Sequence, residues 1–213
     1  MAVLRTTTSS ALTGSVATYY TVTALYSAFV RSILLCNTDT VARTVTGYMV
    51  PASGSAANTN IILPTVSIPA GTSVRFGLSS TLEASATIQL LASTANVVSA
   101  RISALEFLNP SVIVANAPGL LQATSTTYYT ANASKVGILH EVILANTDSV
   151  ARTVTLYMDG TGVANTVLDE VSIAANTVLI LPYNETIAAS GTVRALASSA
   201  NVVSIRVSTT EHS

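Results

Sequence analysis

The sequence predicts an all-β protein made of two tandem antiparallel β-sandwich domains that arose by internal duplication. The first observation is a repeated peptide: "NTDTVARTVTGYM" begins at Asn37, "NTDSVARTVTLYM" begins at Asn146, and eleven of the thirteen positions are identical. The second is the alternation of apolar and polar residues in both copies, which is typical of strands with one buried face. The third is the regular occurrence of turn residues between short β-branched runs.

The repeat extends over nearly the whole chain. The tripeptide "TYY" at Thr18 returns 109 residues later at Thr127, whereas "ANVVS" at Ala95 returns 105 residues later at Ala200. The four missing residues fall within 48–66, where "VPASGSAANTN" is rich in Gly, Pro, Ser and Asn and is typical of a loop. A change of length confined to a loop is expected for two copies of one fold.

These offsets divide the chain into four parts. We expect an N-terminal arm at 1–11, a first β-sandwich at 12–107, a linker at 108–120 and a second β-sandwich at 121–213. The linker contains two prolines and a glycine that interrupt regular structure, and its segment "SVIVA" can add a short strand. At roughly 100 residues, each copy has the size of a domain rather than of a solenoid repeat.

About seven short strands are expected in each repeat, as in an antiparallel sandwich. In repeat 1 the candidates, in chain order, include "YYTVTAL", "VRSILLC", "NIILPTVSI", "TSVRFGL" and "ATIQLLA". Period-two alternation in repeat 2 gives two ladders, which bury Val154, Leu156 and Met158 in the first and Val203, Ile205 and Val207 in the second. The solvent-facing side of the second of these strands is expected to carry Val202, Ser204 and Arg206. No helix of convincing length is predicted.

One turn supports the alignment of the two copies. "IPAGT" at Ile68 becomes "IAANT" at Ile173, so Gly71 is replaced by Asn176. Glycine and asparagine are the residues that most readily adopt a positive φ. We therefore expect the same turn geometry in both repeats.

The composition excludes several functions. Charged residues make up only 9% of the chain, the net charge is −1, and the single lysine is Lys135. Nucleic-acid binding is therefore not expected, because it requires clustered Lys and Arg. No apolar run of about 18 residues predicts a membrane span, and the N-terminus lacks the apolar core of a signal peptide. A chain with so little charge is expected to pack against other subunits.

The repeated pairs Asp39–Arg43 and Asp148–Arg152 admit two interpretations. They form either a polar site present once in each repeat, or a turn in which Asn, Thr and Asp side chains bind local backbone and the arginine pairs with the aspartate. Sequence shared by both copies is more simply explained by the shared fold. We therefore favour the turn, with each segment as a tight connection between adjacent strands.

No catalytic, cofactor-binding or metal-binding residue is predicted, and the chain is not expected to be an enzyme. His140 and His212 lack the spacing of a metal site. The sequence has no phosphate-binding glycine motif and no G-x-S-x-G nucleophile elbow. A glycosidase carboxylate pair and a Ser-His-Asp triad stay geometrically open but have no motif in their favour.

Cysteine and tyrosine are expected to serve the fold. Cys36 lies in an apolar run, so we expect a small core residue, and a lone cysteine offers no disulfide within the chain. Stacking on carbohydrate usually recruits Trp or Tyr, and the chain has no Trp. The tyrosines occur as two repeated pairs, which are expected to be structural: Tyr19, Tyr20, Tyr128 and Tyr129.

The repeated unit resembles the small all-β structural modules of tailed-bacteriophage virions, found in head-decoration and tail-associated proteins. The resemblance rests on "TYYT", an apolar strand that ends in "NTD", a Thr-rich strand that ends in "YM", "VSIPAGT" or "VSIAANT", and "ANVVS" followed by "R.S..E". It covers nearly all of the chain, twice. It implies a non-enzymatic virion component that adheres to other subunits, and it assigns no site residue.

This resemblance leads to the functional hypothesis of a bacteriophage virion structural protein, most simply a capsid decoration or cement protein on the assembled shell. The alternatives are a tail-associated structural protein and a receptor- or glycan-binding adhesin module. The expected partners are the major capsid protein or other virion subunits, together with a cyclic homo-oligomer such as a trimer. Synthesis in the host cytoplasm and a final location on the capsid surface or tail would follow.

The contacts with other subunits are expected where the two copies differ. Those places are the arm at 1–10, the loop at 51–60 and the linker at 109–119. The arm is Thr/Ser-rich, and no counterpart before repeat 2 is evident. We therefore expect it to lie along a neighbouring subunit's sheet edge, where it gains main-chain hydrogen bonds.

Overall fold

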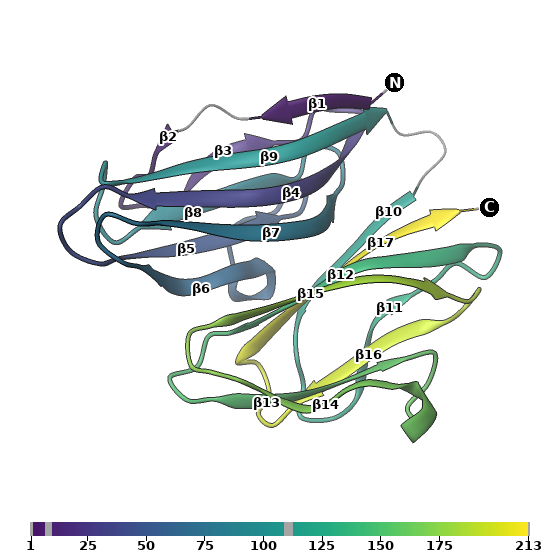
Figure 1. The fold of residues 1–213 in the computed structure, drawn as a ribbon. Coiled ribbons are helices and arrows are strands. Elements are labelled where there is room, and N and C mark those ends of the chain that lie inside the picture. The colour runs from purple at the N-terminus through teal and green to yellow at the C-terminus, as the bar shows by residue number, and fades with distance from the viewer. Residues whose placement is uncertain (1, 7–9, 109–112, 213) are drawn as a thin grey trace.

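The computed structural model describes residues 2–6, 10–108 and 113–212. Its strands form two β-sandwiches, one above the other in the view of Figure 1. The fold class predicted from the sequence is confirmed. No helix of the described residues is long and apolar enough to cross a membrane.

Repeat 1 is built from strands β1 to β9. They are β1 (Ala2–Thr6), β2 (Ser10–Ala11), β3 (Ala17–Thr21), β4 (Tyr26–Asn37), β5 (Arg43–Val50), β6 (Ile61–Ile68), β7 (Ser73–Leu82), β8 (Thr87–Ala92) and β9 (Val98–Leu108). One sheet has the order β1-β9-β4-β7, with β2 also paired to β9, and the other has the order β3-β8-β5-β6. A short 3₁₀ turn, η1 (Asn58–Asn60), precedes β6.

Repeat 2 is built from strands β10 to β17. They are β10 (Ile113–Leu120), β11 (Thr126–Thr130), β12 (Val136–Asn146), β13 (Arg152–Met158), β14 (Thr166–Ile173), β15 (Val178–Ile187), β16 (Thr192–Ala197) and β17 (Val203–His212). The sheets have the orders β10-β17-β12-β15 and β11-β16-β13-β14. The turn η2 (Val163–Asn165) precedes β14.

The strand order is the same in both repeats, as the duplication predicts. If β1 and β2 are taken as one edge position, each repeat has eight positions in two antiparallel sheets, and consecutive positions change sheet except at the hairpins β5–β6 and β13–β14. Consecutive strands after the first therefore cross between sheets or form a hairpin, which is the arrangement of an eight-stranded jelly roll. The length difference falls between β5 and β6, which agrees with the loop predicted at 48–66.

The count of about seven strands per repeat leaves out the first strand of each repeat. The short strand expected from "SVIVA" is confirmed over its described residues, 113–115, as the start of β10. β1 pairs with β9, with Val3 opposite Glu106, and β10 pairs with β17, with Ile113 opposite Glu211. The arm therefore has a counterpart before repeat 2, and the expectation that it has none is wrong. The sequences of the two edge strands differ, because an edge strand is held by backbone hydrogen bonds that any side chain permits.

The same pairing corrects the expected position of the arm. Residues 2–6 lie along the edge of their own sheet rather than along a neighbouring subunit. A segment tethered to the same chain reaches that edge at a high effective concentration, so it pairs there first. The domain boundaries at 12–107 and 121–213 stay a prediction, and the β10 ladder favours a start of repeat 2 at Ile113.

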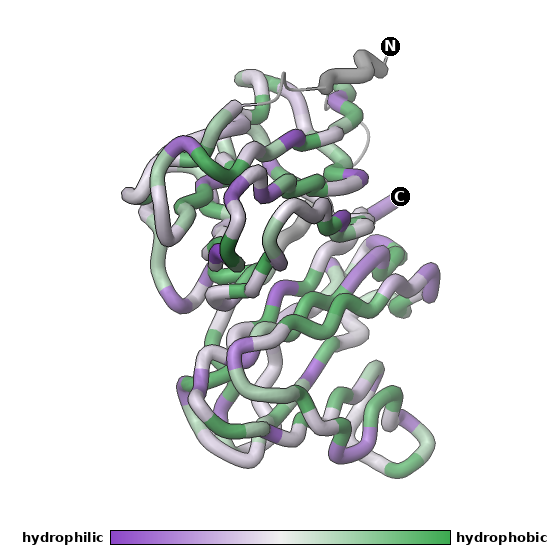
Figure 2. The backbone as a smooth tube through the Cα atoms, turned by 60° about the vertical axis from the view of Figure 1, so that its left-hand side comes forward, coloured by the Kyte–Doolittle hydropathy of each residue, from purple (hydrophilic) through white to green (hydrophobic). Residues whose placement is uncertain are grey.

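Each sandwich is filled by the inward residues of its two sheets. In Figure 2 the apolar segments of each repeat alternate with polar ones along the strands. The first buried face predicted in repeat 2 is confirmed for Val154 and Leu156, which are 1% and 0% exposed, whereas Met158 is only partly buried. In the second ladder Val203, Ile205 and Val207 are buried as predicted.

The prediction that the other side of this strand faces solvent is wrong at two positions. Ser204 and Arg206 are only 2% and 3% exposed. The reason is tertiary, because repeat 1 covers the outer face of β17.

The prediction that the equivalent turns of the two repeats share one geometry is confirmed, since Gly71 and Asn176 have φ values of 61° and 51°.

Candidate functional site: the seam between the repeats

The two sandwiches meet along a seam that uses different parts of each repeat. The outer face of the repeat 2 sheet formed by β10, β17, β12 and β15 packs against the side of repeat 1 formed by β6, β7 and η1. Ile143, on the outer face of β12, joins the hydrophobic core of repeat 1. The seam is therefore a face-to-edge contact rather than a symmetric one.

Arg206 is the central donor of the seam. Its Nη2 donates to the carbonyl of Thr81 at 2.8 Å, and its Nη1 donates to the carbonyl of Met49 at 3.4 Å. On the same strand, Ser204 Oγ donates to the carbonyl of Ile61 at 2.7 Å. Burial lowers the pKa of Arg206 to about 10, so the guanidinium stays charged at neutral pH.

Glu141 is the central acceptor. Its carboxylate accepts hydrogen bonds from the backbone N–H of Ser79, at 2.8 Å, and from the hydroxyl of Ser80. Burial raises the pKa of Glu141, while these hydrogen bonds and the charge of Arg206 act in the opposite direction. Because β7 is an edge strand, its outward N–H groups need partners, and Glu141 supplies one.

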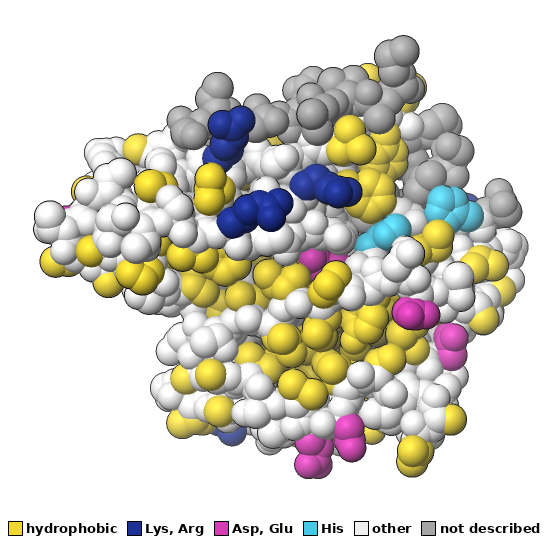
Figure 3. All heavy atoms as spheres, viewed as in Figure 1, with side chains coloured by type: hydrophobic (Ala, Val, Ile, Leu, Met, Phe, Trp, Pro, Cys, Tyr) yellow, Lys and Arg dark blue, Asp and Glu magenta, His cyan; other side chains and the backbone are white. Residues whose placement is uncertain are grey.

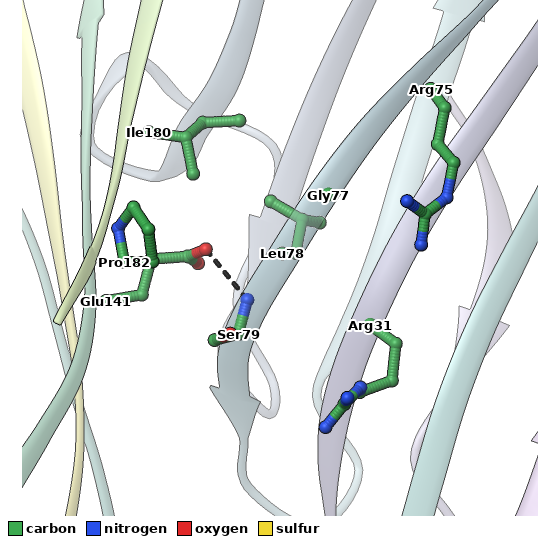
Figure 4. Close-up of a pocket in the computed structure, with 8 residues that line it drawn as sticks. All are labelled: Arg31, Arg75, Gly77, Leu78, Ser79, Glu141, Ile180 and Pro182. Carbon is green, nitrogen blue, oxygen red and sulfur yellow. Dashed lines mark hydrogen bonds between the residues drawn. The ribbon is translucent and has the colours of Figure 1, made fainter. Parts of the chain in front are cut away.

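An open cavity of about 460 Å³ runs along the seam. Its lining comes from both repeats: Arg31, Arg75, Gly77, Leu78, Ser79, Glu141, Ile180 and Pro182. Figure 4 shows Arg31 and Arg75 on one side and Glu141 on the other, with its carboxylate turned toward Ser79. The two arginines are exposed, whereas Glu141 is 1% exposed.

A second recess, of about 370 Å³, lies at another part of the seam. Phe29 packs against Phe107 with ring centroids 5.4 Å apart, and against His140 edge-on at 5.0 Å. Leu105, Ile138, Thr210 and His212 complete the lining. The walls are mainly apolar, so this recess suits the apolar face of a ligand or of a neighbouring protein.

The two histidines, far apart in sequence, come together here. His140 Nε2 lies 2.8 Å from Thr210 Oγ1, which lies 3.2 Å from His212 Nε2. Burial, with a smaller effect of His212, lowers the pKa of His140, which favours its neutral form. Among the described residues no group of three or more His, Cys, Asp or Glu side chains is placed to hold a metal ion.

The interpretation of the Asp–Arg pairs as turns is confirmed. Asp39 accepts from Arg43 Nε at 2.7 Å, and Asp148 accepts from Arg152 Nε at 2.8 Å. Each aspartate also accepts from the next backbone N–H. The expectation that each turn connects adjacent strands is wrong, because the two strands are consecutive in the chain but belong to different sheets. Each turn is therefore an arch between the sheets and not a hairpin.

A buried asparagine anchors each arch. The side-chain amide of Asn146 donates to the carbonyls of Val150, Ile173 and Ala174 at 2.9 to 3.1 Å. Asn37 makes the equivalent bonds in repeat 1. This explains why "NTD" is shared by the two copies.

The tyrosine pairs are structural, as predicted. Tyr20 donates to Glu106 and Tyr129 donates to Glu211, both at 2.8 Å and both buried. The prediction for Cys36 is wrong, since it is only half-buried. Its neighbour Leu35 fills the core, so alternation turns Cys36 toward the outer face.

Sequence reasoning did not identify the seam residues. No sequence pattern distinguishes Glu141 from the other acidic residues, and period-two alternation places Arg206 on the solvent-facing side of its strand. A signal is present in the last strand, where Arg206 stands between Ile205 and Val207 in a chain with few charges. The equivalent Arg101 has a similar apolar context and is exposed, so that signal alone could not identify the buried arginine.

Fold and seam together define the class of the protein: two jelly rolls in tandem, joined by a buried face-to-edge contact. No family model matches the chain, and no curated protein matches it by sequence.

Solved structures resemble it at low TM-scores. The STIV MCP has a TM-score of 0.34 and 9% identity over 100% of this chain and 97% of that chain. A structure of infectious bursal disease virus, Gx strain, has a TM-score of 0.30 and 11% identity over 99% and 78%. A fucolectin from striped bass (Morone saxatilis) serum has a TM-score of 0.29 and 12% identity over 99% and 96%. At these scores the likeness decides no function.

Proposed function

We propose that the chain is a non-enzymatic structural subunit of a virion. The observation that carries the proposal is the use of its buried charges. Arg206 and Glu141 bind backbone groups of the neighbouring repeat and hold two domains as one block. Groups used in this way serve assembly rather than chemistry, and the low charge of the chain suits a protein that stays packed against others.

The finer proposal is a decoration protein on the capsid of a tailed bacteriophage, with a tail-associated position as its variant. Jelly rolls occur in viral capsid proteins and also in lectins, so the fold is compatible with this role without selecting it. The resemblance of the repeated sequence to bacteriophage virion modules is what favours decoration.

The test is to raise an antibody against the chain and probe particles purified from cells that carry the gene. We expect the chain to co-sediment with intact particles, and gold label to lie on the capsid surface. Label on the tail would select the tail-associated variant. Absence of the chain from every particle fraction would contradict the proposal.

A glycan-binding adhesin is the second candidate, and the second recess of the seam, which is lined by Phe29, Phe107 and His140, favours it. Phe29 and Phe107 could stack on the apolar face of a sugar. A glycan array probed with wild type and with Phe29→Ala separates the two roles. Binding that Phe29→Ala abolishes, without loss of thermal stability, would support the adhesin.

A further inference from the structure

The seam uses half of the surfaces that the duplication provides. Repeat 2 contributes a sheet face and repeat 1 contributes an edge formed by β6, β7 and η1. The equivalent face of repeat 1, formed by β9, β4 and β7, presents exposed residues beside the seam recesses and is called the open face; the equivalent edge of repeat 2, formed by β14, β15 and η2, also presents exposed residues and is called the open edge. On that edge Val163 is 95% exposed.

The donors of the seam have counterparts on the open face. Strands β9 and β17 correspond with an offset of 105 residues, so Arg101 takes the place of Arg206. By the same offset, Ser99 takes the place of Ser204. Arg101 is exposed. The open face therefore repeats the two donors that hold the seam.

The acceptors of the seam have counterparts on the open edge. Arg206 and Ser204 donate to three backbone carbonyls of repeat 1. Pairing in β5, β6 and β7 matches that in β13, β14 and β15. The equivalent carbonyls belong to Met158, Thr166 and Thr186. Backbone carbonyls are present whatever the side chain, so this half of the contact survives the sequence difference.

A serine and a glutamate exchange places between the two surfaces. In the seam, Glu141 on the face accepts from Ser80 on the edge. The register places Ser32, which is 8% exposed, on the open face where Glu141 stands, and Glu185, which is exposed, on the open edge where Ser80 stands. The donor and acceptor are reversed but complementary. A contact between the open face and the open edge would therefore keep one serine–glutamate hydrogen bond, with its donor and acceptor on opposite sides from those of the seam.

Charge distinguishes the two open surfaces further. The open face carries three exposed arginines, Arg31, Arg75 and Arg101. The open edge carries three exposed acids, Asp169, Glu170 and Glu185. The whole chain has nine basic and ten acidic residues, so these six form a substantial share. Figure 3 shows basic side chains together over repeat 1, and acidic ones over repeat 2.

We propose that a second copy of this chain covers these surfaces. The acidic edge of repeat 2 (β14, β15 and η2) docks on the basic face of repeat 1 (β9, β4 and β7) of the next copy, in the arrangement that the seam shows within one chain. Arg101 of the next copy then donates to the carbonyls of Met158 and Thr186 of the first copy, and Glu185 of the first copy accepts from Ser32 of the next. The contact is heterologous, so it closes into a ring or continues as a filament.

This contact does not depend on where the protein functions. Two basic faces would repel each other, which disfavours a two-fold dimer through the same face. The proposal therefore distinguishes head-to-tail association from symmetric dimerisation. It stands or falls separately from the assignment to a virion.

The first test measures mass by sedimentation at increasing concentrations up to about 1 mM, the weak end of specific association. Wild type is expected to form species larger than a monomer, and about 1 M salt should weaken them because exposed charges are screened. Arg101→Glu on the face and Glu185→Arg on the edge should each weaken association by about 30-fold or more. Arg194→Glu on β16 is the matched control and should associate like wild type.

The decisive test mixes the two variants. Arg101→Glu retains an intact edge and Glu185→Arg retains an intact face, so a mixture is expected to associate through this pair of intact surfaces although each variant alone associates weakly. Thermal denaturation checks that each variant is folded. A wild type that stays monomeric over the whole range overturns the proposal. So does a mixture that stays monomeric while wild type associates, because that result assigns the association to other surfaces.

Discussion

At the scale of single residues, the fully buried asparagines of the two arches do most to fix the chain path. Asn146→Ala leaves three carbonyls without their donor, and we expect it to lower the free energy of unfolding by about 1–3 kcal/mol. Asn37→Ala should have a similar effect, because its bonds are the same. Urea denaturation measures both. A loss below about 0.5 kcal/mol in both variants would show that water replaces the amide.

The titratable groups respond to pH in opposite directions. The pKa values of Asp39 and Asp148 are lowered, mainly by hydrogen bonds from their arginines, so their contribution is present above the ordinary value of 3.8 and is lost as pH falls through the folded pKa. The pKa of Glu141 is raised by burial, so its contribution is full below its ordinary value of 4.5 and is lost as pH rises through the folded pKa.

Glu141→Gln isolates the second effect. The variant cannot ionise, so the stability of wild type relative to it should fall as pH rises from about 3.5 to 8. Urea denaturation of both proteins across that range gives the difference at each pH. A difference that does not change with pH would mean that Glu141 titrates alike in the folded and unfolded chain.

At the scale of elements, β17 and β9 show how one strand sequence serves two environments. Arg206→Ala removes a buried donor from two carbonyls and should lower the free energy of unfolding by about 2–4 kcal/mol. Arg101→Ala is the matched control and should change the stability of the monomer by no more than about 0.5 kcal/mol. Calorimetry at low concentration makes the comparison. Equal losses would contradict the assignment of the seam to β17.

The edge strand β1 makes a second prediction at this scale. Deletion of 2–6 exposes the backbone of β9 along that edge, so the amides of β9 that face β1 should exchange with solvent faster. Hydrogen exchange measured by mass spectrometry reports this directly, with β17 as the internal control. Unchanged exchange in β9 would place the arm elsewhere in solution.

At the scale of the whole molecule, the seam makes the two repeats one unit. Repeat 2 alone would expose Glu141, Ile143 and Arg206, so we expect the fragment 113–213 to be markedly less stable than the full chain. The full chain should unfold in one calorimetric transition. Two separate transitions would show that the repeats unfold independently and that the seam contributes little.

The sequence by itself determined the duplication, the all-β class, the Asp–Arg turns and the positive-φ turns. Those features follow from period-two alternation and from local side-chain to backbone bonds, which depend on neighbours in the chain. The few charges of the chain also lead us to expect no nucleic-acid surface.

Only the tertiary structure decided which faces are covered. Arg101 and Arg206 occupy equivalent positions with similar neighbours, yet one is exposed and the other is 3% exposed. The difference arises because the face of repeat 2 meets the edge of repeat 1, a contact between residues more than 100 positions apart. The meeting of His140 with His212, the pairing of β1 with β9 and the pairing of β10 with β17 likewise depend on contacts between residues far apart in the chain. Local sequence specifies a strand and its faces, but the packing of distant elements specifies what each face touches.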